Sequence, residues 1–143
     1  MFIKEHTLNL EKELVKKFYE IIWNQYDKKA ILDILHETFK FRGSLGQYKE
    51  GHSGFVEYLD MVHAGLENYR CEILEMVAEP SKVFAKMHFS GIHKDKFMGF
   101  NATNRNVRWE GAALFHFRDK KISELWVLGD LKNLESQLSV AKT

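Results

Sequence analysis

The amino-acid sequence predicts an α+β domain in which helices pack on one face of a curved, mostly antiparallel sheet. Two observations carry this prediction. Apolar residues recur at helical spacing through most of the first 66 residues, whereas apolar and polar residues alternate along most of the chain from residue 70 onward. The chain has one proline, no linker-like stretch and no internal repeat, so residues 1–143 are expected to form a single domain.

Three helices are expected before the long strands. The first carries apolar residues at helical spacing up to Trp23 and would begin after an N-cap at Asn9. A short second helix covers about residues 29–35, and Ser53 is a candidate cap for the third. Between the second and third helices, residues 39–42 alternate apolar and polar side chains, which indicates a short strand.

The second half of the chain is expected to form four strands and one helix. The strands cover residues 70–78, 82–93, 107–118 and 122–129. Asp119 and Lys120 would form the tight turn between the last two strands, which makes these strands a hairpin. Asp130 follows the last strand and precedes a periodic segment over residues 131–138, so it is a candidate cap for a final helix.

The hairpin predicts which side chains share a face of the sheet, because directly paired residues point to the same side. If Arg118 pairs with Lys121, then Asp130 lies opposite Trp109, and Trp126 points to the same face. Two tryptophans and several small residues make this the face that the helices are expected to cover.

Alternation along the preceding strand adds Phe89 and His93 to the helix-covered face. The opposite face carries His116, Leu125 and Val127 and has no cover within one subunit. Because this outer sheet face is partly apolar, we expect it to form the interface of a homodimer.

Composition excludes several classes of function. Lys and Arg total 21 against 20 acidic residues, so no large positive field is present to hold nucleic acid. No apolar run approaches the roughly 20 residues of a membrane span, and the first residues lack the apolar core of a signal peptide, so a cytoplasmic protein is expected. The single cysteine, Cys71, excludes an internal disulfide and a Cys-rich zinc site.

Asp130 is the main candidate for a catalytic role. Beside Trp109 and near Trp126 its carboxyl group would lose water, its pKa would rise, and it could act as a general acid or base near neutral pH. Trp109, Trp126 and Phe89 would then line the substrate pocket. The alternative is that Asp130 only caps the final helix.

Three further residues are candidates for contacts with a substrate. His93, near the pocket mouth, is a second possible acid or base, or else it hydrogen-bonds the loop that follows it. The guanidinium of Arg42 could hold a substrate carboxylate or enolate, or pair with Glu50 or Asp95 at the surface. Tyr19 either lines the cavity or belongs to the core.

Several segments resemble the SnoaL-like polyketide cyclase, or ester cyclase, family. They are FRGSLG at 41–46, GIHKDKFMGFNATNR at 91–105 and GAALFHFRDKKISELWVLGDLKNLESQL at 111–138, together with VKKFYEIIWNQ near the start. The resemblance implies a nuclear-transport-factor-2-like cone with three N-terminal helices on the concave face of the sheet and a short C-terminal helix. It also implies a dimer and a ligand pocket between sheet and helices.

In cyclases of this family the acidic residue of a W-x-x-x-D motif is the acid/base of an intramolecular aldol closure, and no cofactor or metal is used. The resemblance carries this role to Asp130. Family members often have a histidine where this chain has Leu125, and His116 lies too far along the ladder from Asp130 to replace it.

Three hypotheses about function follow. The first is a cofactor-free acid/base enzyme that cyclises or isomerises a small hydrophobic carbonyl compound, with Asp130 as acid/base. The second is a protein of the same fold that binds a small hydrophobic molecule without catalysis. The third is an assembly role for the outer sheet face.

Overall fold

The computed structural model describes residues 2–139 of the 143-residue chain. The helical segments are α1 (Phe2–Lys17), the π-helix η1 (Phe18–Asn24), the 3₁₀ turn η2 (Lys28–Ala30), α2 (Ile31–Ile34), α3 (Gly51–Gly65) and α4 (Leu131–Leu138). The strands are β1 (Leu35–Arg42), β2 (Tyr48–Glu50), β3 (Leu66–Glu79), β4 (Lys82–His93), β5 (Asn106–Arg118) and β6 (Lys121–Gly129).

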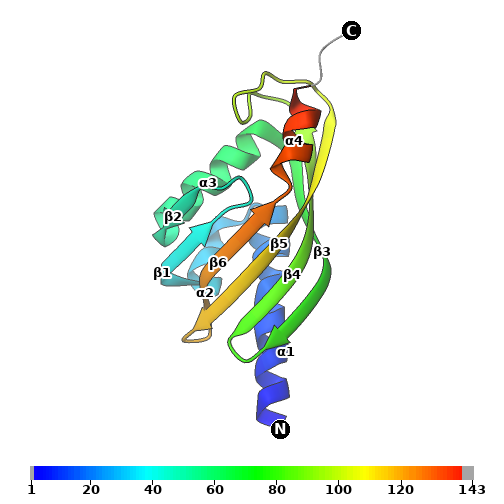
Figure 1. Ribbon diagram of the computed structural model, residues 1–143. Coiled ribbons are helices and arrows are strands. Elements are labelled where there is room, and N and C mark those ends of the chain that lie inside the picture. Colours follow the sequence, from blue (N-terminus) through cyan, green and yellow to red (C-terminus); the bar gives the residue numbers. More distant parts are fainter. Residues whose placement is uncertain (1, 140–143) are drawn as a thin grey trace.

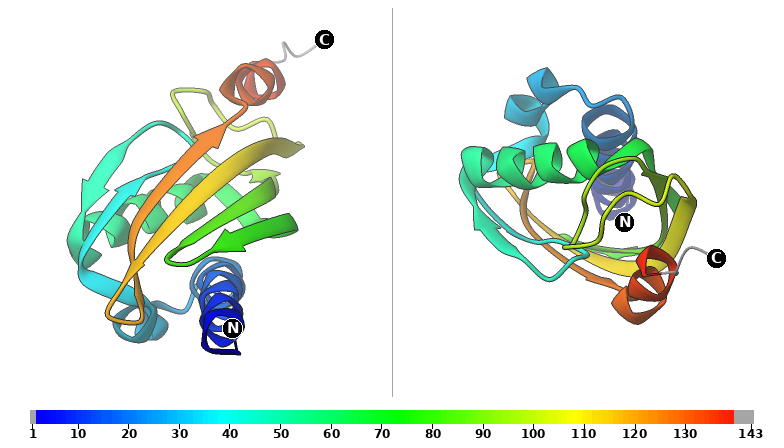
Figure 2. Two further views of the ribbon diagram at one scale, coloured as in Figure 1. Left: turned by 60° about the horizontal axis from the view of Figure 1, so that its bottom comes forward. Right: turned by 90° about the horizontal axis from the view of Figure 1, so that it is seen from above.

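The described strands form one sheet in the order β2-β1-β6-β5-β4-β3. β1 runs parallel to β6, and the other neighbouring pairs are antiparallel. The sheet is twisted and curved (Figure 1), and α3 and the N-terminal helices lie on its concave side (Figure 2). The predicted α+β class is therefore confirmed.

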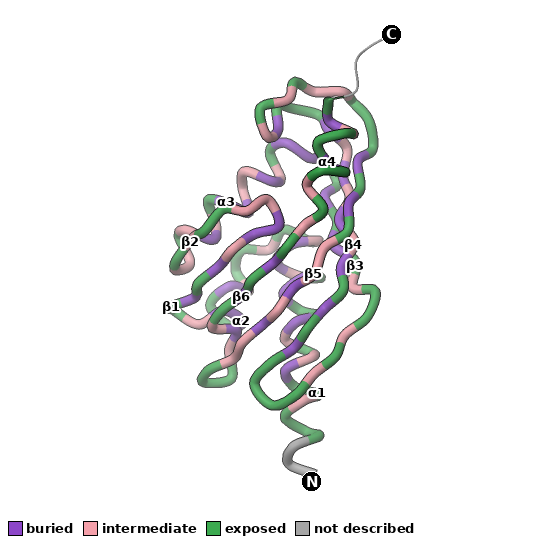
Figure 3. Tube along the Cα trace, in the orientation of Figure 1, coloured by how far each residue is buried: buried purple, intermediate pink, exposed green. Residues whose placement is uncertain are grey.

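The core fills the space between the helices and the concave face of the sheet. Along β4 and β5, buried and more exposed residues alternate (Figure 3), because successive side chains of a strand point to opposite faces. Met87 and Phe115 on these strands, and Phe18 and Phe55 on the helices, have no exposed surface. Burying each such side chain stabilises the fold by about 1.5–3 kcal/mol.

Two predicted helix starts are wrong. α1 begins at Phe2, and Asn9 lies inside it; residues 5–10 of this helix are mostly exposed, so no apolar periodicity marks them. α3 begins at Gly51 rather than at Ser53, and Glu50 precedes it without a capping side-chain hydrogen bond. The short edge strand β2 was not predicted, because Gly46 and Gly51 on either side of it are typical of a loop.

A β-bulge overturns the predicted faces of the hairpin. Arg118 pairs with Lys121 as predicted, but Ser123 is an extra residue on β6, so the register shifts by one beyond it. Trp126 therefore points to the outer face and is 41% exposed, whereas Leu125 and Val127 point inward and are 1% and 3% exposed.

No helix within residues 2–139 combines the length and the apolar character needed to cross a lipid bilayer.

Candidate functional site

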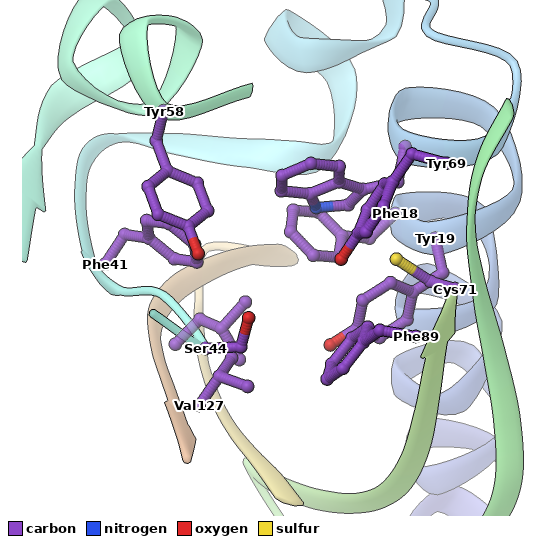
Figure 4. Close-up of a pocket in the computed structure, with 11 residues that line it drawn as sticks. Phe18, Tyr19, Phe41, Ser44, Tyr58, Tyr69, Cys71, Phe89 and Val127 are labelled. Carbon is purple, nitrogen blue, oxygen red and sulfur yellow. The ribbon is translucent and has the colours of Figure 1, made fainter. Parts of the chain in front are cut away.

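A small hollow lies in the core between η1, α3 and the concave face of the sheet. Eleven residues line it (Figure 4): Phe18, Tyr19, Trp23, Phe41, Ser44, Tyr58, Tyr69, Cys71, Phe89, Leu125 and Val127. Its free volume is about 10 Å³, which is room for one water molecule. The aromatic side chains therefore fill most of the space where the family resemblance implied a ligand pocket.

The helical wall of the hollow is the π-helix η1. Its wider turn is shown by the hydrogen bond from the Gln25 N–H to the Glu20 carbonyl (3.1 Å). Tyr19 and Trp23 on η1 face the hollow and are 3% and 4% exposed. Single π-turns are uncommon within helices and are frequent at functional sites.

The aromatic rings around the hollow pack mostly edge to face. Trp23 meets Tyr69 with ring centroids 5.3 Å apart, and Phe41 meets Tyr58 at 4.9 Å. Tyr69 and Phe89 lie parallel at 6.5 Å. Such contacts fix ring positions beyond the effect of burial alone, so the wall is well ordered.

Four hydroxyl groups, those of Tyr19, Ser44, Tyr58 and Tyr69, point toward the centre of the hollow (Figure 4). Tyr58 bonds with the Ser44 side chain and accepts a hydrogen bond from the Leu45 N–H at 3.2 Å. The Tyr19 hydroxyl is buried and has no hydrogen-bond partner within the described residues. The hollow thus combines an apolar wall with converging polar groups, which is typical of small-molecule sites.

Burial keeps these groups neutral. Loss of solvent raises the pKa of Tyr58 to about 12 and raises the pKa values of Tyr19 and Tyr69 well above the ordinary phenol value. The pKa of the Cys71 thiol is also raised, again mainly by desolvation. At neutral pH the phenols are hydrogen-bond donors, and Cys71 is an unreactive thiol.

A glycine allows Tyr58 to reach this position. A Cβ atom on Gly43 would lie 2.3–2.7 Å from atoms of the Tyr58 ring, which is closer than side chains approach. Gly43 directly follows β1, so the strand end and the α3 side chain pack against each other at this point.

Asp130 is not in the hollow, and its predicted burial beside Trp109 and near Trp126 is wrong. It is exposed, and its side chain caps α4 by accepting a hydrogen bond from the Asn133 N–H at 3.2 Å. The bulge in β6 explains the difference, because it places Asp130 on the outer side of the sheet while Trp109 stays on the inner side. The alternative prediction, a helix cap, is confirmed.

Residues that follow Asp130 also hold α4 in place. The side chain of Gln137 donates to the Arg108 carbonyl (2.6 Å) and accepts from the Arg108 N–H (2.9 Å), which continues the hydrogen bonding of β5. Leu134 and Leu138 are buried beneath the helix. A surface groove of about 330 Å³ beside α4 is lined by Asp130 together with His88, Glu110 and an edge of the otherwise buried Trp109, so Asp130 and Trp109 do border one space.

His93 is fully buried and serves the loop that follows β4. One ring nitrogen lies 3.2 Å from the Phe100 carbonyl, and the other accepts from the Thr103 N–H at 3.3 Å. The predicted alternative for His93 is thus confirmed. It does not line the hollow, and it is not a lining residue of the groove that contains Asp130.

The other predicted contact residues divide between the two faces. Phe89 and Tyr19 line the hollow, and Trp109 packs behind Phe89 with centroids 5.4 Å apart. Trp126 and Arg42 lie on the outer side instead: the Arg42 guanidinium stacks over Trp126 at 5.7 Å and donates to backbone carbonyls, including that of Val127.

Tyr69, Cys71 and Ser44 were missed. The strand that carries Tyr69 and Cys71 begins at Leu66, four residues before its predicted start. Tyr69, Cys71 and Ile73 alternate along this strand, so alternation from Ile73 would have placed Tyr69 and Cys71 on the inner face, whereas the bulge near Asn68 breaks the alternation before Tyr69. Ser44 lies in the turn after β1, for which the sequence pattern gives no direction of the side chain. Within the described residues, no group of three or more His, Cys, Asp or Glu could hold a metal ion.

Solved structures share this fold. The chain superimposes on a SnoaL-like protein from Jannaschia sp. CCS1 with a TM-score of 0.87 and 16% identity, covering 95% of this chain and 96% of that chain. TsrD from Streptomyces laurentii has a TM-score of 0.81 and 21% identity, with 93% and 97% covered. IdmH from Streptomyces antibioticus has a TM-score of 0.78 and 18% identity, with 90% and 98% covered. These identities establish the fold alone.

A search of curated proteins found no match. The family model described as SnoaL-like polyketide cyclase matches residues 13–138, nearly the whole chain. Together with the cone of helices on a curved sheet, this match identifies the chain as a member of the SnoaL-like polyketide cyclase family.

Proposed function

We propose that this protein binds a small, neutral, hydrophobic molecule whose acceptor oxygen reaches the hydroxyl groups of the hollow when the side chains around the hollow rearrange, without catalysing a reaction. The observation that carries the proposal is the ring of hydroxyl groups from Tyr19, Ser44, Tyr58 and Tyr69 inside an aromatic wall. Buried donors of this kind favour a ligand that offers them oxygen and disfavour one that buries an unpaired charge.

The same wall argues against acid/base chemistry in the hollow. A general acid or base works best with a pKa near the operating pH. The described lining contains no carboxylate, imidazole or amine, and burial raises the pKa values of its phenols and its thiol away from neutrality. Binding therefore fits these side chains better than proton transfer does.

The family relationship supports a second candidate, acid/base turnover of a carbonyl compound by Asp130. Asp130 faces the groove of about 330 Å³ beside α4, where His88 and Glu110 also lie. A substrate of this reaction would bind on the outer side of the sheet. Asp130→Asn would then lower turnover by about 100-fold or more, the usual scale for a missing acid or base.

Three naphthalene derivatives test the proposal: 2-acetylnaphthalene, 2-ethylnaphthalene and 2-naphthoate, titrated into the purified protein by calorimetry. The ketone is expected to bind about 3- to 10-fold more tightly than the hydrocarbon, as one hydrogen bond supplies. The carboxylate is expected not to bind, because the hollow would leave its charge unpaired.

Asp130→Asn serves as the control, since it leaves the hollow intact and should bind the ketone like wild type. Equal affinity for ketone and hydrocarbon, or preference for the carboxylate, would contradict the proposal. Consumption of the ketone by wild type but not by Asp130→Asn would favour the second candidate.

We further propose that two copies associate through the outer sheet face. One outward-facing residue from each strand forms a continuous row: Val77, Phe84, Leu114, Trp126, Arg42 and Tyr48. Phe84, Trp126 and Tyr48 are 40%, 41% and 76% exposed. A neighbouring row carries charges of both signs: Glu79, Lys82, His116, Glu124, Lys40 and Glu50. A mainly apolar row across a whole sheet favours a protein partner.

A two-fold axis along β5 makes these rows complementary. It places Phe84 against Trp126 of the second copy and Lys82 against Glu124 of the second copy, with Leu114 on the axis. Isologous dimers bring the same patch together in this way. The register therefore supports a homodimer of this arrangement.

A further inference from the structure

We propose that the hollow and the surface groove between η1 and β3 form one continuous ligand site, which opens when the side chain of Tyr19 turns. This inference rests on the proposed function, because it assigns the route and the outer half of the same binding site. The groove has a volume of about 410 Å³. Small-molecule sites commonly measure about 300–1,000 Å³, so the groove supplies the space that the hollow lacks.

Two side chains separate the groove from the hollow. Tyr19 and Cys71 line both spaces, Tyr19 from the helical side and Cys71 from β3. The other residues around the groove, among them Lys16, Arg70 and Glu72, do not reach the hollow. A ligand that passes from the groove to the hollow must therefore pass between Tyr19 and Cys71.

Tyr19 is held less firmly than the neighbouring phenols. Tyr58 bonds with Ser44 and with the Leu45 N–H, and Tyr69 interacts with the Cys71 thiol. The Tyr19 hydroxyl has no partner within the described residues, although it is buried. Because a buried donor without a partner is unfavourable, a rotation that exposes this hydroxyl, or a ligand that accepts from it, recovers the lost hydrogen bond.

The backbone around this barrier is fixed. The Asn24 side chain donates to the Cys71 carbonyl (2.9 Å) and accepts from the Cys71 N–H (2.7 Å), which ties the end of η1 to the edge strand β3. The strand cannot move away from the helix without breaking both bonds. Opening is therefore a side-chain rotation of Tyr19, packed edge-on against Phe18 and Phe115.

The two halves of the site differ in character. The hollow accepts an apolar group with a neutral oxygen, as argued above. The groove is bordered by charges of both signs, including Lys16, Glu20, Arg70 and Glu72, and also by Met76. The ligand class is therefore an elongated molecule with a neutral aromatic or aliphatic end and a more polar end that stays near the surface.

Cys71 reports the opening without any ligand. It is the single cysteine and, although it borders the groove, it is only 4% exposed, so a small thiol reagent such as methyl methanethiosulfonate reacts with it slowly while Tyr19 covers it. Tyr19→Leu should raise the labelling rate of Cys71 by about tenfold or more under native conditions. The labelling rate of the fully unfolded chain, measured in denaturant, should change little. Tyr19→Phe retains the ring but lacks the hydroxyl that gains a hydrogen bond on rotation, so it should label no faster than wild type.

Phe89→Leu is the matched control, because Phe89 pairs with Cys71 across β3 and β4 and lines the hollow but not the groove. Its labelling rate should stay within about threefold of wild type after correction for the unfolding free energy. The proposed route would be overturned if Tyr19→Leu and Phe89→Leu raised the labelling rate of Cys71 equally, or if Tyr19→Leu left that rate unchanged.

A surface variant tests the same route if Tyr19→Leu does not fold. Leu74 lines the groove and is 46% exposed, so Leu74→Trp should narrow the groove and slow the labelling of Cys71. Leu32→Trp, at an exposed leucine on α2, is the control and should leave the rate unchanged. Unchanged labelling in Leu74→Trp would count against the route. Because no ligand is involved, these results do not depend on whether the naphthalene compounds bind.

Discussion

His63 connects the surface to the aromatic wall of the hollow. One of its ring nitrogens lies 3.0 Å from the Trp23 carbonyl, and its ring stacks on Tyr26 with centroids 3.9 Å apart. Burial is the main cause that lowers the pKa of His63, partly offset by the bond to Trp23 and by the nearby Asp60. The neutral imidazole therefore belongs to the folded state.

This lowered pKa predicts how stability depends on pH. Below the ordinary histidine pKa of about 6.5 the unfolded chain binds a proton at His63, whereas the folded protein does so only at lower pH. The free energy of unfolding therefore decreases as the pH falls from about 6.5 toward the lower pKa of the folded state. His63→Gln should remove that part of the pH dependence, because glutamine cannot titrate. Urea unfolding of both proteins from about pH 8 to about pH 5 measures the difference. Parallel stability curves would show that His63 contributes nothing.

At the level of single elements, α4 shows how a sequence motif can serve structure. Asp130 caps the first turn of α4, and Gln137, in its last turn, hydrogen-bonds the backbone of β5. Leu134 and Leu138 are buried between α4 and the rest of the protein. These contacts give Asp130, Gln137 and the two leucines a structural role without any reaction.

The cap gives a prediction that separates the two roles of Asp130. Asp130→Ala should lower the free energy of unfolding by about 1 kcal/mol, whereas Asp130→Asn should be nearly neutral, since asparagine caps helices as well as aspartate. Chemical denaturation of both variants checks this. If Asp130→Asn destabilises the protein as much as Asp130→Ala does, the contribution of Asp130 depends on its charge rather than on the cap.

The elements show where sequence reasoning succeeds. The bounds of β4 and α4 were predicted to the residue, because strict alternation and a clear cap mark them. The faces of β6 were not predicted, because nothing in the sequence marks Ser123 as a bulge, and one inserted residue reverses every following side chain. That single residue moved Trp126 and Asp130 out of the predicted site.

The candidate site could be predicted only in part, because sequence patterns do not determine how side chains pack. Alternation placed Phe89 on the inner face, where it lines the hollow, whereas Tyr19 was left open between the cavity and the core. Periodicity does not indicate whether rings meet or leave space, and that depends on the rotamers of many side chains together. The volume of the hollow is therefore a property of the packed core.

For the whole molecule, the row on the outer face predicts an assembly that one substitution can disrupt. Leu114→Arg would place two like charges together on the proposed two-fold axis and should convert the dimer to a monomer. Leu32→Arg, the same change at an exposed leucine on α2, should leave the dimer intact. Light scattering after size exclusion measures both masses. A wild-type monomer at micromolar concentration, or an unaffected Leu114→Arg dimer, would contradict this interface.

The proposed neutral site has a consequence for binding that one titration can measure. The affinity of the wild-type protein for 2-acetylnaphthalene should stay constant from about pH 7 to about pH 9, because burial raises the pKa values of Tyr19, Tyr58, Tyr69 and Cys71. The compound should also be recovered unchanged. A one-proton change in affinity across this range, or conversion of the ketone, would show that a titrating group works in the site and that the hollow is not the neutral binding site proposed.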